Sequence, residues 1–161
     1  MASDHFRTSL FNALERAPWS TEFAGRRVLD LFAGAGAWGF EALRRGAAFV
    51  LFVETDPVQR GAIREIIETQ SLFGVTRIHR RDATDMGAKP AGLSDPFDLV
   101  FVDPPDSALG TMALPRLREG GWIASDATIV FVGAGAEVLS GFTILDRHTD
   151  GAGEALFMRP A

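Results

Sequence analysis

Short runs of almost wholly apolar residues alternate with segments of helical periodicity through most of this sequence, and this alternation restricts the possible folds more than any other feature. The clearest apolar runs occupy residues 28–32, 48–53 and 97–102. A strand buried on both faces has this composition, whereas a strand with one solvated face alternates polar and apolar positions. The pattern therefore predicts an α/β fold, a mostly parallel sheet with helices on both of its faces.

The remaining segments supply the other elements expected of such a sheet. Helices are predicted over residues 4–16 behind an Asp4 cap, over 37–45 up to Gly46, from the Asp56-Pro57 cap to about Phe73, and over 109–117 with a break at Pro115. Further strands are predicted over 75–79 and 128–132, and residues 142–145 and 155–158 are expected to pair as an antiparallel hairpin around Asp150-Gly151.

Length and composition limit the class of protein. The 161 residues suit a single domain, in which residues 1–24 form a helix and a linker and residues 25–161 form the core that would carry the site. No apolar run is long enough to cross a bilayer and no charged leader opens the sequence, so we expect a cytoplasmic protein without membrane association, with a monomer as its simplest state. The absence of cysteine excludes disulfides, thiolate metal ligands and a cysteine nucleophile.

The histidines and the net charge argue against two further kinds of site. His5, His79 and His148 are scattered without ligand spacing, and we therefore expect no metal site. The net charge of −5 argues against a surface built for indiscriminate phosphate binding, although a local basic patch such as Arg80-Arg81 is compatible with it.

A glycine turn, Gly34-Ala35-Gly36-Ala37-Trp38-Gly39, follows the first apolar run. In a parallel α/β sheet such a turn lets the backbone approach a nucleotide-like ligand at the carboxyl end of a strand. Its G-x-G-x-x-G spacing alone fits NAD, FAD and S-adenosylmethionine, so other residues must distinguish among them.

Acidic residues in or after three of the expected strands favour S-adenosylmethionine. Asp30, four residues before Gly34, can face the ammonium of a methionine-like tail, and a carboxylate within an apolar strand needs such a partner. Glu54, 20 residues after Gly34, can accept hydrogen bonds from both ribose hydroxyls. Asp82 and Ala83 can offer a carboxylate to an adenine amino group and a backbone N–H to a ring nitrogen.

A second turn, Asp103-Pro104-Pro105, ends the apolar run at residues 97–102. The two prolines fix their own φ angles and restrict the residue before each, so this turn holds the Asp103 carboxylate and the Pro104 carbonyl in a stiff loop. Because the carboxyl ends of parallel strands share one edge of a sheet, these acceptors should lie beside the bound ligand. The turn therefore predicts a reaction centre.

These motifs together resemble the bacterial 16S ribosomal RNA guanine-N2 methyltransferases. The resemblance is carried by Leu10-Phe11-Asn12, Val28-Leu29-Asp30-Leu31-Phe32-Ala33-Gly34-Ala35-Gly36, Glu41-Ala42-Leu43-Arg44-Arg45-Gly46-Ala47, Val53-Glu54 and Asp103-Pro104-Pro105. It runs through nearly the whole chain and implies the Rossmann-like, seven-stranded sheet of class I methyltransferases. It also implies S-adenosylmethionine as donor, S-adenosylhomocysteine as product, no metal, and RNA or the small ribosomal subunit as partner, with an exocyclic guanine amine as acceptor.

The resemblance also implies roles for individual residues. Donor binding is expected from Asp30, Phe32, Ala33, Gly34, Gly36, Glu54, Thr55, Asp82 and Ala83. Asp103, Pro104 and Pro105 are expected to be catalytic, with the Asp103 carboxylate and the Pro104 carbonyl each accepting one N–H of the target amine, so that its lone pair points at the methyl group. No strong general base is required, because the alkylated nitrogen loses its proton readily.

Three features differ from that family. Asp106 stands where the family has an aromatic residue that stacks on the target base, and Asp150 precedes Gly151 where tyrosine is usual. The family also carries a basic β-hairpin before the Leu-Phe-Asn helix, whereas this sequence begins close to that helix. Acids at the mouth of the site would repel a polyanion. Two alternatives therefore stay open: a diverged S-adenosylmethionine-binding protein that is inactive alone, and an enzyme acting on another amine.

Overall fold

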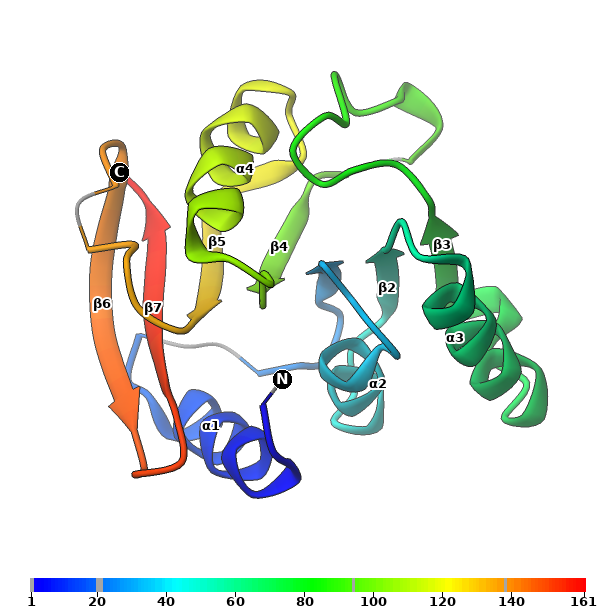
Figure 1. Ribbon diagram of the computed structural model, residues 1–161, viewed down its shortest axis with the longest axis horizontal. Helices are drawn as coiled ribbons and strands as arrows, with labels where there is room; N and C mark the ends of the chain where they lie inside the picture. The colour runs from blue at the N-terminus through cyan, green and yellow to red at the C-terminus, as the bar shows by residue number, and fades with distance from the viewer. Residues whose placement is uncertain (1, 20–21, 94, 138) are drawn as a thin grey trace.

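The centre of the molecule, in the part of the chain that the computed structural model describes (residues 2–19, 22–93, 95–137 and 139–161), is a seven-stranded sheet (Figure 1). Its strands are β1 (Arg27–Leu31), β2 (Phe49–Val53), β3 (Thr76–His79), β4 (Phe97–Val102), β5 (Ile123–Val132), β6 (Phe142–Thr149) and β7 (Glu154–Pro160). They lie in the order β3-β2-β1-β4-β5-β7-β6, and β7 is antiparallel to both of its neighbours. The predicted mostly parallel sheet and its terminal antiparallel hairpin are confirmed.

Helices cover both faces of this sheet, as predicted. The helices are α1 (Asp4–Arg16), α2 (Ala37–Arg44), α3 (Pro57–Thr69) and α4 (Ser107–Glu119), with short 3-10 turns at Phe73–Val75 and Ala91–Leu93. α1, α2 and α3 pack on one face and α4 on the other (Figure 1). The core is accordingly divided into two apolar layers, one on each side of the sheet.

The alternation of side chains along β1 decides which layer each residue enters. Val28 belongs to the layer beneath α1 and α2, and Leu29 and Leu31 belong to the layer beneath α4. Successive side chains of a strand point to opposite faces, so Asp30 points with Val28 toward the layer of α2. Its side chain is completely buried, at 0% exposure.

Two helix ends differ from the sequence prediction. α1 is capped by Ser3, whose hydroxyl accepts a hydrogen bond from the Phe6 N–H at 3.1 Å, while Asp4 is the first helical residue. α3 ends at Thr69 instead of near Phe73, because Ser71 adopts a left-handed φ of +54° and breaks the helical path. The sequence prediction continued the helix to about Phe73, but this apolar side chain is 66% exposed and does not belong to the buried face of α3.

The helix α4, the strand β5 and both strands of the terminal hairpin are longer than predicted. α4 continues through Pro115, although proline lacks the N–H that would bond one turn back. The buried side chains of Leu114 and Leu117 hold this stretch against the sheet and offset that loss. β5 begins at Ile123 instead of 128. Its pairing with β4 contains a register shift, and the early part of the strand includes polar residues that interrupt the apolar run used for the prediction.

The close packing of α2 on β2 generates a stability prediction at Gly39. A Cβ on this residue would lie 2.5 Å from a Phe52 ring carbon and 2.7 Å from a Val50 methyl carbon. Gly39→Ala should therefore lower the free energy of unfolding, measured by urea denaturation, by about 1–3 kcal/mol. Gly61→Ala in α3 is the matched control, because no atom lies within 4 Å of its added Cβ. The control should gain about 0.5–1 kcal/mol, and equal gains in both variants would contradict the packing described.

Candidate active site

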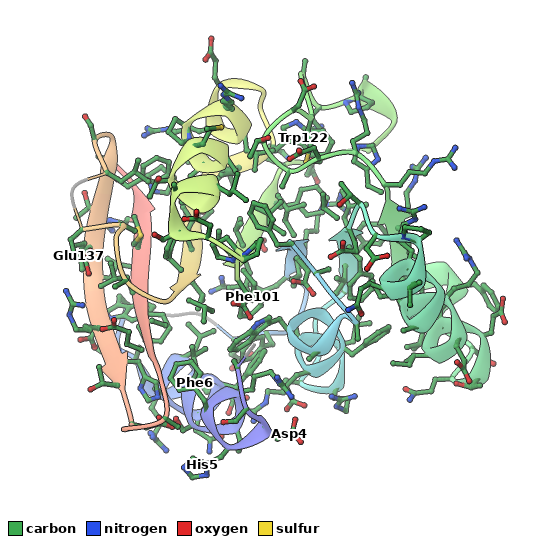
Figure 2. The ribbon with its side chains drawn as sticks, in the orientation of Figure 1. Asp4, His5, Phe6, Phe101, Trp122 and Glu137 are labelled. Atoms are coloured by element: carbon green, nitrogen blue, oxygen red, sulfur yellow. The ribbon has the colours of Figure 1, made fainter. Side chains whose placement is uncertain are left out.

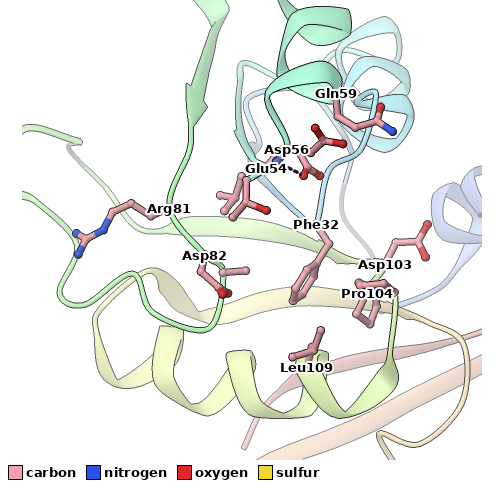
Figure 3. Close-up of a pocket in the computed structure, with 13 residues that line it drawn as sticks. Phe32, Glu54, Asp56, Gln59, Arg81, Asp82, Asp103, Pro104 and Leu109 are labelled. Carbon is pink, nitrogen blue, oxygen red and sulfur yellow. Dashed lines mark hydrogen bonds between the residues drawn. The ribbon is translucent and has the colours of Figure 1, made fainter.

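A cavity of about 420 Å³ opens at the carboxyl ends of the central parallel strands. It is lined by Phe32, Val53, Glu54, Thr55, Asp56, Gln59, Arg81, Asp82, Ala83, Asp103, Pro104, Pro105 and Leu109. Asp82 and Asp103 lie toward opposite ends, with Phe32 and Leu109 between them (Figure 3). Its volume lies in the range of sites that enclose a small ligand.

The glycine turn between β1 and α2 adopts a backbone path that side chains would obstruct. Phe32, Gly34 and Gly36 have φ angles of +55°, +57° and +85°, in the left-handed region that favours glycine. A Cβ on Gly36 would lie 2.8 Å from the Phe40 ring and 2.9 Å from the Phe52 ring, whereas one on Gly34 would meet no protein atom within 4 Å. Gly36 is therefore required by packing, and Gly34 leaves open space that a ligand can approach.

The Glu54 carboxylate fixes this turn to the end of β2. Its Oε1 accepts a hydrogen bond from the Gly34 N–H at 2.7 Å. Its Oε2 accepts one from the Asp56 N–H at 2.9 Å, which Figure 3 marks with a dashed line. Each carboxylate oxygen has a second lone-pair direction, so both can still accept from a ligand. The side chain predicted to bind ribose hydroxyls thus lies in the cavity wall and also orders the backbone around it.

Asp30 lies behind the turn instead of in the cavity wall. Its Oδ2 accepts a hydrogen bond from the Gly39 N–H at 3.0 Å, and its buried Oδ1 has no hydrogen-bond partner among the described residues. Burial raises the pKa of this carboxyl well above its ordinary value; the Gly39 bond opposes that rise, and the charges of Asp103 and Glu54 add to it. A buried acceptor without a partner is the kind of group that a bound ligand or water completes.

Asp82 and Ala83 follow β3 at one end of the cavity. The Asp82 Oδ1 accepts hydrogen bonds from the backbone N–H of Thr84 at 2.8 Å and from its hydroxyl at 2.7 Å. These two bonds lower the pKa of Asp82, so the carboxylate is ionised near neutral pH. Ala83 is 4% exposed and lines the cavity beside it.

The Asp-Pro-Pro turn forms the other end of the cavity. Asp103 Oδ2 accepts a hydrogen bond from Trp38 Nε1 at 2.9 Å. Pro104 and Pro105 then lead into α4, whose first turn is capped by Asp106 through an Oδ1 bond to the Ala108 N–H at 3.0 Å. Asp106 therefore stabilises a helix start, a role that the sequence comparison with an aromatic position did not reveal.

Two aromatic residues close to the turns belong to the core instead of the cavity wall. Trp38 and Phe101 are buried with their ring centroids 5.4 Å apart, while Phe32 lines the cavity. Asp150 is not among the lining residues, and its Oδ2 accepts a hydrogen bond from the Ser9 hydroxyl of α1 at 2.9 Å. These contacts join segments remote in sequence, which periodicity does not predict.

Five residues that line the cavity were not predicted from the sequence as site residues: Val53, Asp56, Gln59, Arg81 and Leu109. Gln59 lies in the first turn of α3, one turn beyond the expected Asp56 cap, and helical spacing from that cap could have identified it. Leu109 comes from the start of α4, behind the prolines. Arg81 borders the Asp82 end, and its side chain points outward (Figure 3).

The arrangement suits a long, cationic, hydroxyl-bearing ligand. Carboxylates stand in the cavity wall at Glu54, Asp82 and Asp103, and the unpartnered oxygen of Asp30 lies behind the turn. Phe32 and Leu109 supply apolar surface in the middle. These acceptors and apolar side chains thus fit S-adenosylmethionine, which has a positive sulfonium and ammonium, a ribose and an adenine.

Neither a candidate membrane-spanning helix nor a candidate metal site occurs among the described residues. No helix among them is both long and apolar enough to cross a bilayer. No group of three or more histidine or carboxylate side chains within the same ranges is placed to hold a metal ion.

Similar proteins were found by sequence. The putative rRNA methyltransferase YlbH of Bacillus subtilis is 34% identical over 131 residues, which cover 77% of this chain and 68% of that protein. The ribosomal RNA small subunit methyltransferase D of Escherichia coli is 34% identical over 130 residues, covering 79% of this chain and 60% of that protein. The chain thus spans less than two thirds of the length of the second relative.

Solved structures and a family model agree with these relatives. A putative methyltransferase from Escherichia coli, yhhF, superposes with a TM-score of 0.80 at 26% identity, covering 99% of this chain and 87% of that one. A putative methylase from Haemophilus influenzae superposes with a TM-score of 0.75 at 26% identity, covering 98% and 97%. The model of the family described as "Conserved hypothetical protein 95" matches residues 2–158. Because that match includes nearly the whole chain, the protein belongs to this family.

Proposed function

We propose that this protein is an S-adenosylmethionine-dependent methyltransferase that methylates the exocyclic N2 amine of a guanine in small-subunit ribosomal RNA. The observation that carries the proposal is the position of the Asp-Pro-Pro turn (residues 103–105) at one end of the cavity, with Glu54 and Asp82 in the same wall. The names of two relatives, a putative rRNA methyltransferase and a small-subunit rRNA methyltransferase, support the class of acceptor.

The residues of the cavity divide between the parts of the donor. Glu54 would accept hydrogen bonds from the ribose hydroxyls, Asp82 and Ala83 would bind the adenine, and Asp30 Oδ1 would accept from the ammonium directly or through water. Phe32, Ala33, Gly34, Gly36 and Thr55 complete this set. When bound, S-adenosylmethionine supplies an electrophilic methyl group on a positive sulfur. The remaining chemistry is the orientation of the attacking amine.

The Asp-Pro-Pro turn provides the acceptors for that orientation. With Oδ2 engaged by Trp38, the Asp103 carboxylate retains Oδ1 for one N–H of the amine, and the Pro104 carbonyl is available for the other. Two acceptors held in a stiff loop pull the nitrogen toward tetrahedral geometry and direct its lone pair at the methyl carbon. The N–C bond forms as the S–C bond breaks. The alkylated nitrogen then releases a proton, and the Asp103 charge stabilises the transient cation.

Asp106 is one of the three sequence features that motivate the alternative of a diverged, inactive donor-binding protein. Its capping bond to Ala108 gives this acid a structural role that is compatible with catalysis. Asp106 is exposed at the start of α4, and its carboxylate offers no ring on which a base can stack. The base would therefore stack on other side chains that line the cavity. We therefore propose that the guanine lies against Pro105 at that end of the cavity and against Leu109 in its middle, because both supply apolar surface.

The proposal predicts separate effects on donor binding and methyl transfer at Asp103. Asp103→Ala should lower kcat on small-subunit particles or ribosomal RNA by about a hundredfold or more, because one of two orienting acceptors is lost. Its affinity for S-adenosylhomocysteine, measured by calorimetry, should change little. Mass spectrometry of digested RNA should identify N2-methylguanine with the parent protein. Absence of donor binding would reject the cofactor, and a methyl group elsewhere would reject the acceptor.

The buried carboxyl of Asp30 predicts opposite effects on stability and binding. Because the folded protein holds its proton more tightly than the unfolded chain, whose carboxyl has the ordinary pKa of 3.8, stability falls as pH rises above that value. Asp30→Asn removes this loss and keeps an acceptor for Gly39. In chemical denaturation, the ligand-free variant should be more stable than the parent at pH 7, with the difference vanishing below pH 3.8.

The same variant should bind the donor more weakly. Loss of a hydrogen bond to a charged group should reduce the affinity for S-adenosylmethionine by about tenfold or more. Calorimetry at pH 7 measures this change. A variant that is less stable at that pH, or that binds the donor as tightly as the parent, would contradict the role given to Asp30.

An exposed basic segment beside the cavity supports RNA as the acceptor. Arg77, Arg80 and Arg81 are exposed and have no carboxylate partner among the described residues. The pKa of His79, which lies between these arginines, is lowered chiefly by burial, and the charges of Arg81 and Arg77 add to that decrease. Exposed positive charge of this kind attracts phosphates even on a chain of net charge −5.

Replacing two of these arginines should weaken RNA binding in a salt-dependent way. The double variant Arg80→Ala/Arg81→Ala should raise KM for RNA several-fold, and the slope of log affinity against log salt should fall by up to about 2. Arg159→Ala on β7 is the control for the loss of charge alone, because this exposed arginine does not line the cavity. Equal effects of the control, per arginine removed, would contradict a local phosphate contact.

A further inference from the structure

Trp38 connects the aromatic core to the Asp-Pro-Pro turn. This residue lies in the first turn of α2, and its side chain is 3% exposed. Its indole Nε1 donates a hydrogen bond to Asp103 Oδ2 at 2.9 Å. A core tryptophan is thus bonded directly to the carboxylate proposed to orient the methyl acceptor.

The rings of Phe11 and Phe101, which also contact each other, fix the position of that indole. Trp38 stacks on Phe101 of β4 with centroids 5.4 Å apart and planes inclined by 16°, and on Phe11 of α1 at 5.9 Å and 29°. Phe11 and Phe101 are themselves in contact at 5.4 Å. Figure 2 shows Phe101 between the sheet and the two helices. Rotation of the indole would disturb contacts with two elements, so the direction of its N–H is set by the core.

The chemistry of this bond gives the two carboxylate oxygens of Asp103 different roles. An indole N–H can only donate, so Asp103 Oδ2 is the acceptor of the bond. The bond occupies Oδ2 and leaves Oδ1 for the substrate.

We propose that Trp38 is a positioning residue: its buried N–H fixes the rotation of the Asp103 carboxylate so that Oδ1 meets the amine of the acceptor. The inference rests on the proposed methyltransferase function, because it assigns Asp103 the orienting role. It also gives α1 a part in catalysis, since Phe11 supports the indole from that helix.

Trp122 offers a comparison within the same chain. It is 1% exposed, its Nε1 donates to the Gly87 carbonyl at 2.8 Å, and its ring stacks on Phe97 at 6.5 Å and 15°. It belongs to the layer on the other face of the sheet (Figure 2). Its burial, stacking and indole bond thus match those of Trp38, but within the described part of the chain its hydrogen bond and ring contacts go to Gly87, His79 and Phe97 instead of to the Asp-Pro-Pro turn.

The first test detects the hydrogen bond without any need for activity. In the ¹⁵N–¹H spectrum of the full chain, Trp38→Phe assigns the Trp38 indole signal by its disappearance. Asp103→Ala should shift that signal and speed its exchange with solvent, and should leave the Trp122 signal unchanged. A Trp38 signal that does not respond to Asp103→Ala would overturn the inference.

The second test separates positioning from general support of the fold. Trp38→Phe keeps an aromatic ring against Phe11 and Phe101 but removes the N–H. It should lower kcat about tenfold to a hundredfold, with little change in KM for RNA or in affinity for S-adenosylhomocysteine. Trp122→Phe should leave kcat unchanged at temperatures where it is folded.

A double-mutant cycle completes this test under single-turnover conditions. If Trp38 acts through Asp103, then Trp38→Phe should cause no further loss in the Asp103→Ala background. An equal loss in both backgrounds would reveal a merely structural role and overturn the inference. Failure of the parent protein to bind donor or methylate RNA would instead reject the proposed function, and the spectroscopic test would still decide whether the Trp38 bond exists.

Discussion

Two carboxylates accept hydrogen bonds from backbone N–H groups of the glycine turn, and the geometry of the whole site depends on these bonds. Glu54 holds the Gly34 N–H from the end of β2, and Asp30 holds the Gly39 N–H from within β1. Between these bonds, Gly36 and Gly39 allow the turn and the start of α2 to lie against the Phe52 ring, closer than any residue with a Cβ could. The same contacts place Trp38 where its N–H meets Asp103. A change at any of these positions would thus move the donor end and the acceptor end of the cavity together.

The cost of this arrangement falls on Asp30. Burying a carboxylate away from water costs free energy. The hydrogen bond from the Gly39 N–H satisfies Oδ2, but Oδ1 has no partner among the described residues. A cationic ligand near the turn would relieve both the desolvation and the repulsion from Glu54 and Asp103. Residues that weaken the empty protein and strengthen a complex are typical of binding sites, where stability and function compete. The burial of Asp30 is therefore consistent with the role proposed for this carboxyl in binding a cationic ligand.

The sequence could predict those parts of the fold and site that local patterns encode. Apolar runs gave the parallel strands, and the segments that follow them gave the positions of Glu54, Asp82 and Asp103 at one edge, because strand ends in such a sheet necessarily converge. The bond between Trp38 and Asp103 joins residues 65 positions apart and depends on rings from three elements, so no local pattern contains it. Asp106 was interpreted as a lost aromatic and as an acid at the mouth of the site, since its capping bond can be recognised only when the start of α4 is known. Pro115 misled for the opposite reason, because tertiary packing outweighed a local rule.

Net charge is a poor guide to the acceptor of such a site. The acids around the cavity are bonded to N–H groups of the protein: Glu54 to two backbone amides, Asp82 to Thr84, and Asp103 to an indole. Such bonds disperse negative charge and hold the carboxylates in fixed directions, toward a ligand inside the cavity. The guanidinium groups of Arg77, Arg80 and Arg81 are exposed instead, and no carboxylate within the described ranges forms an ion pair with them. A polyanion approaching this edge of the sheet would therefore meet exposed positive charge before it met the acids of the cavity wall. An overall charge of −5 is compatible with RNA as a substrate when the two signs are segregated in this way.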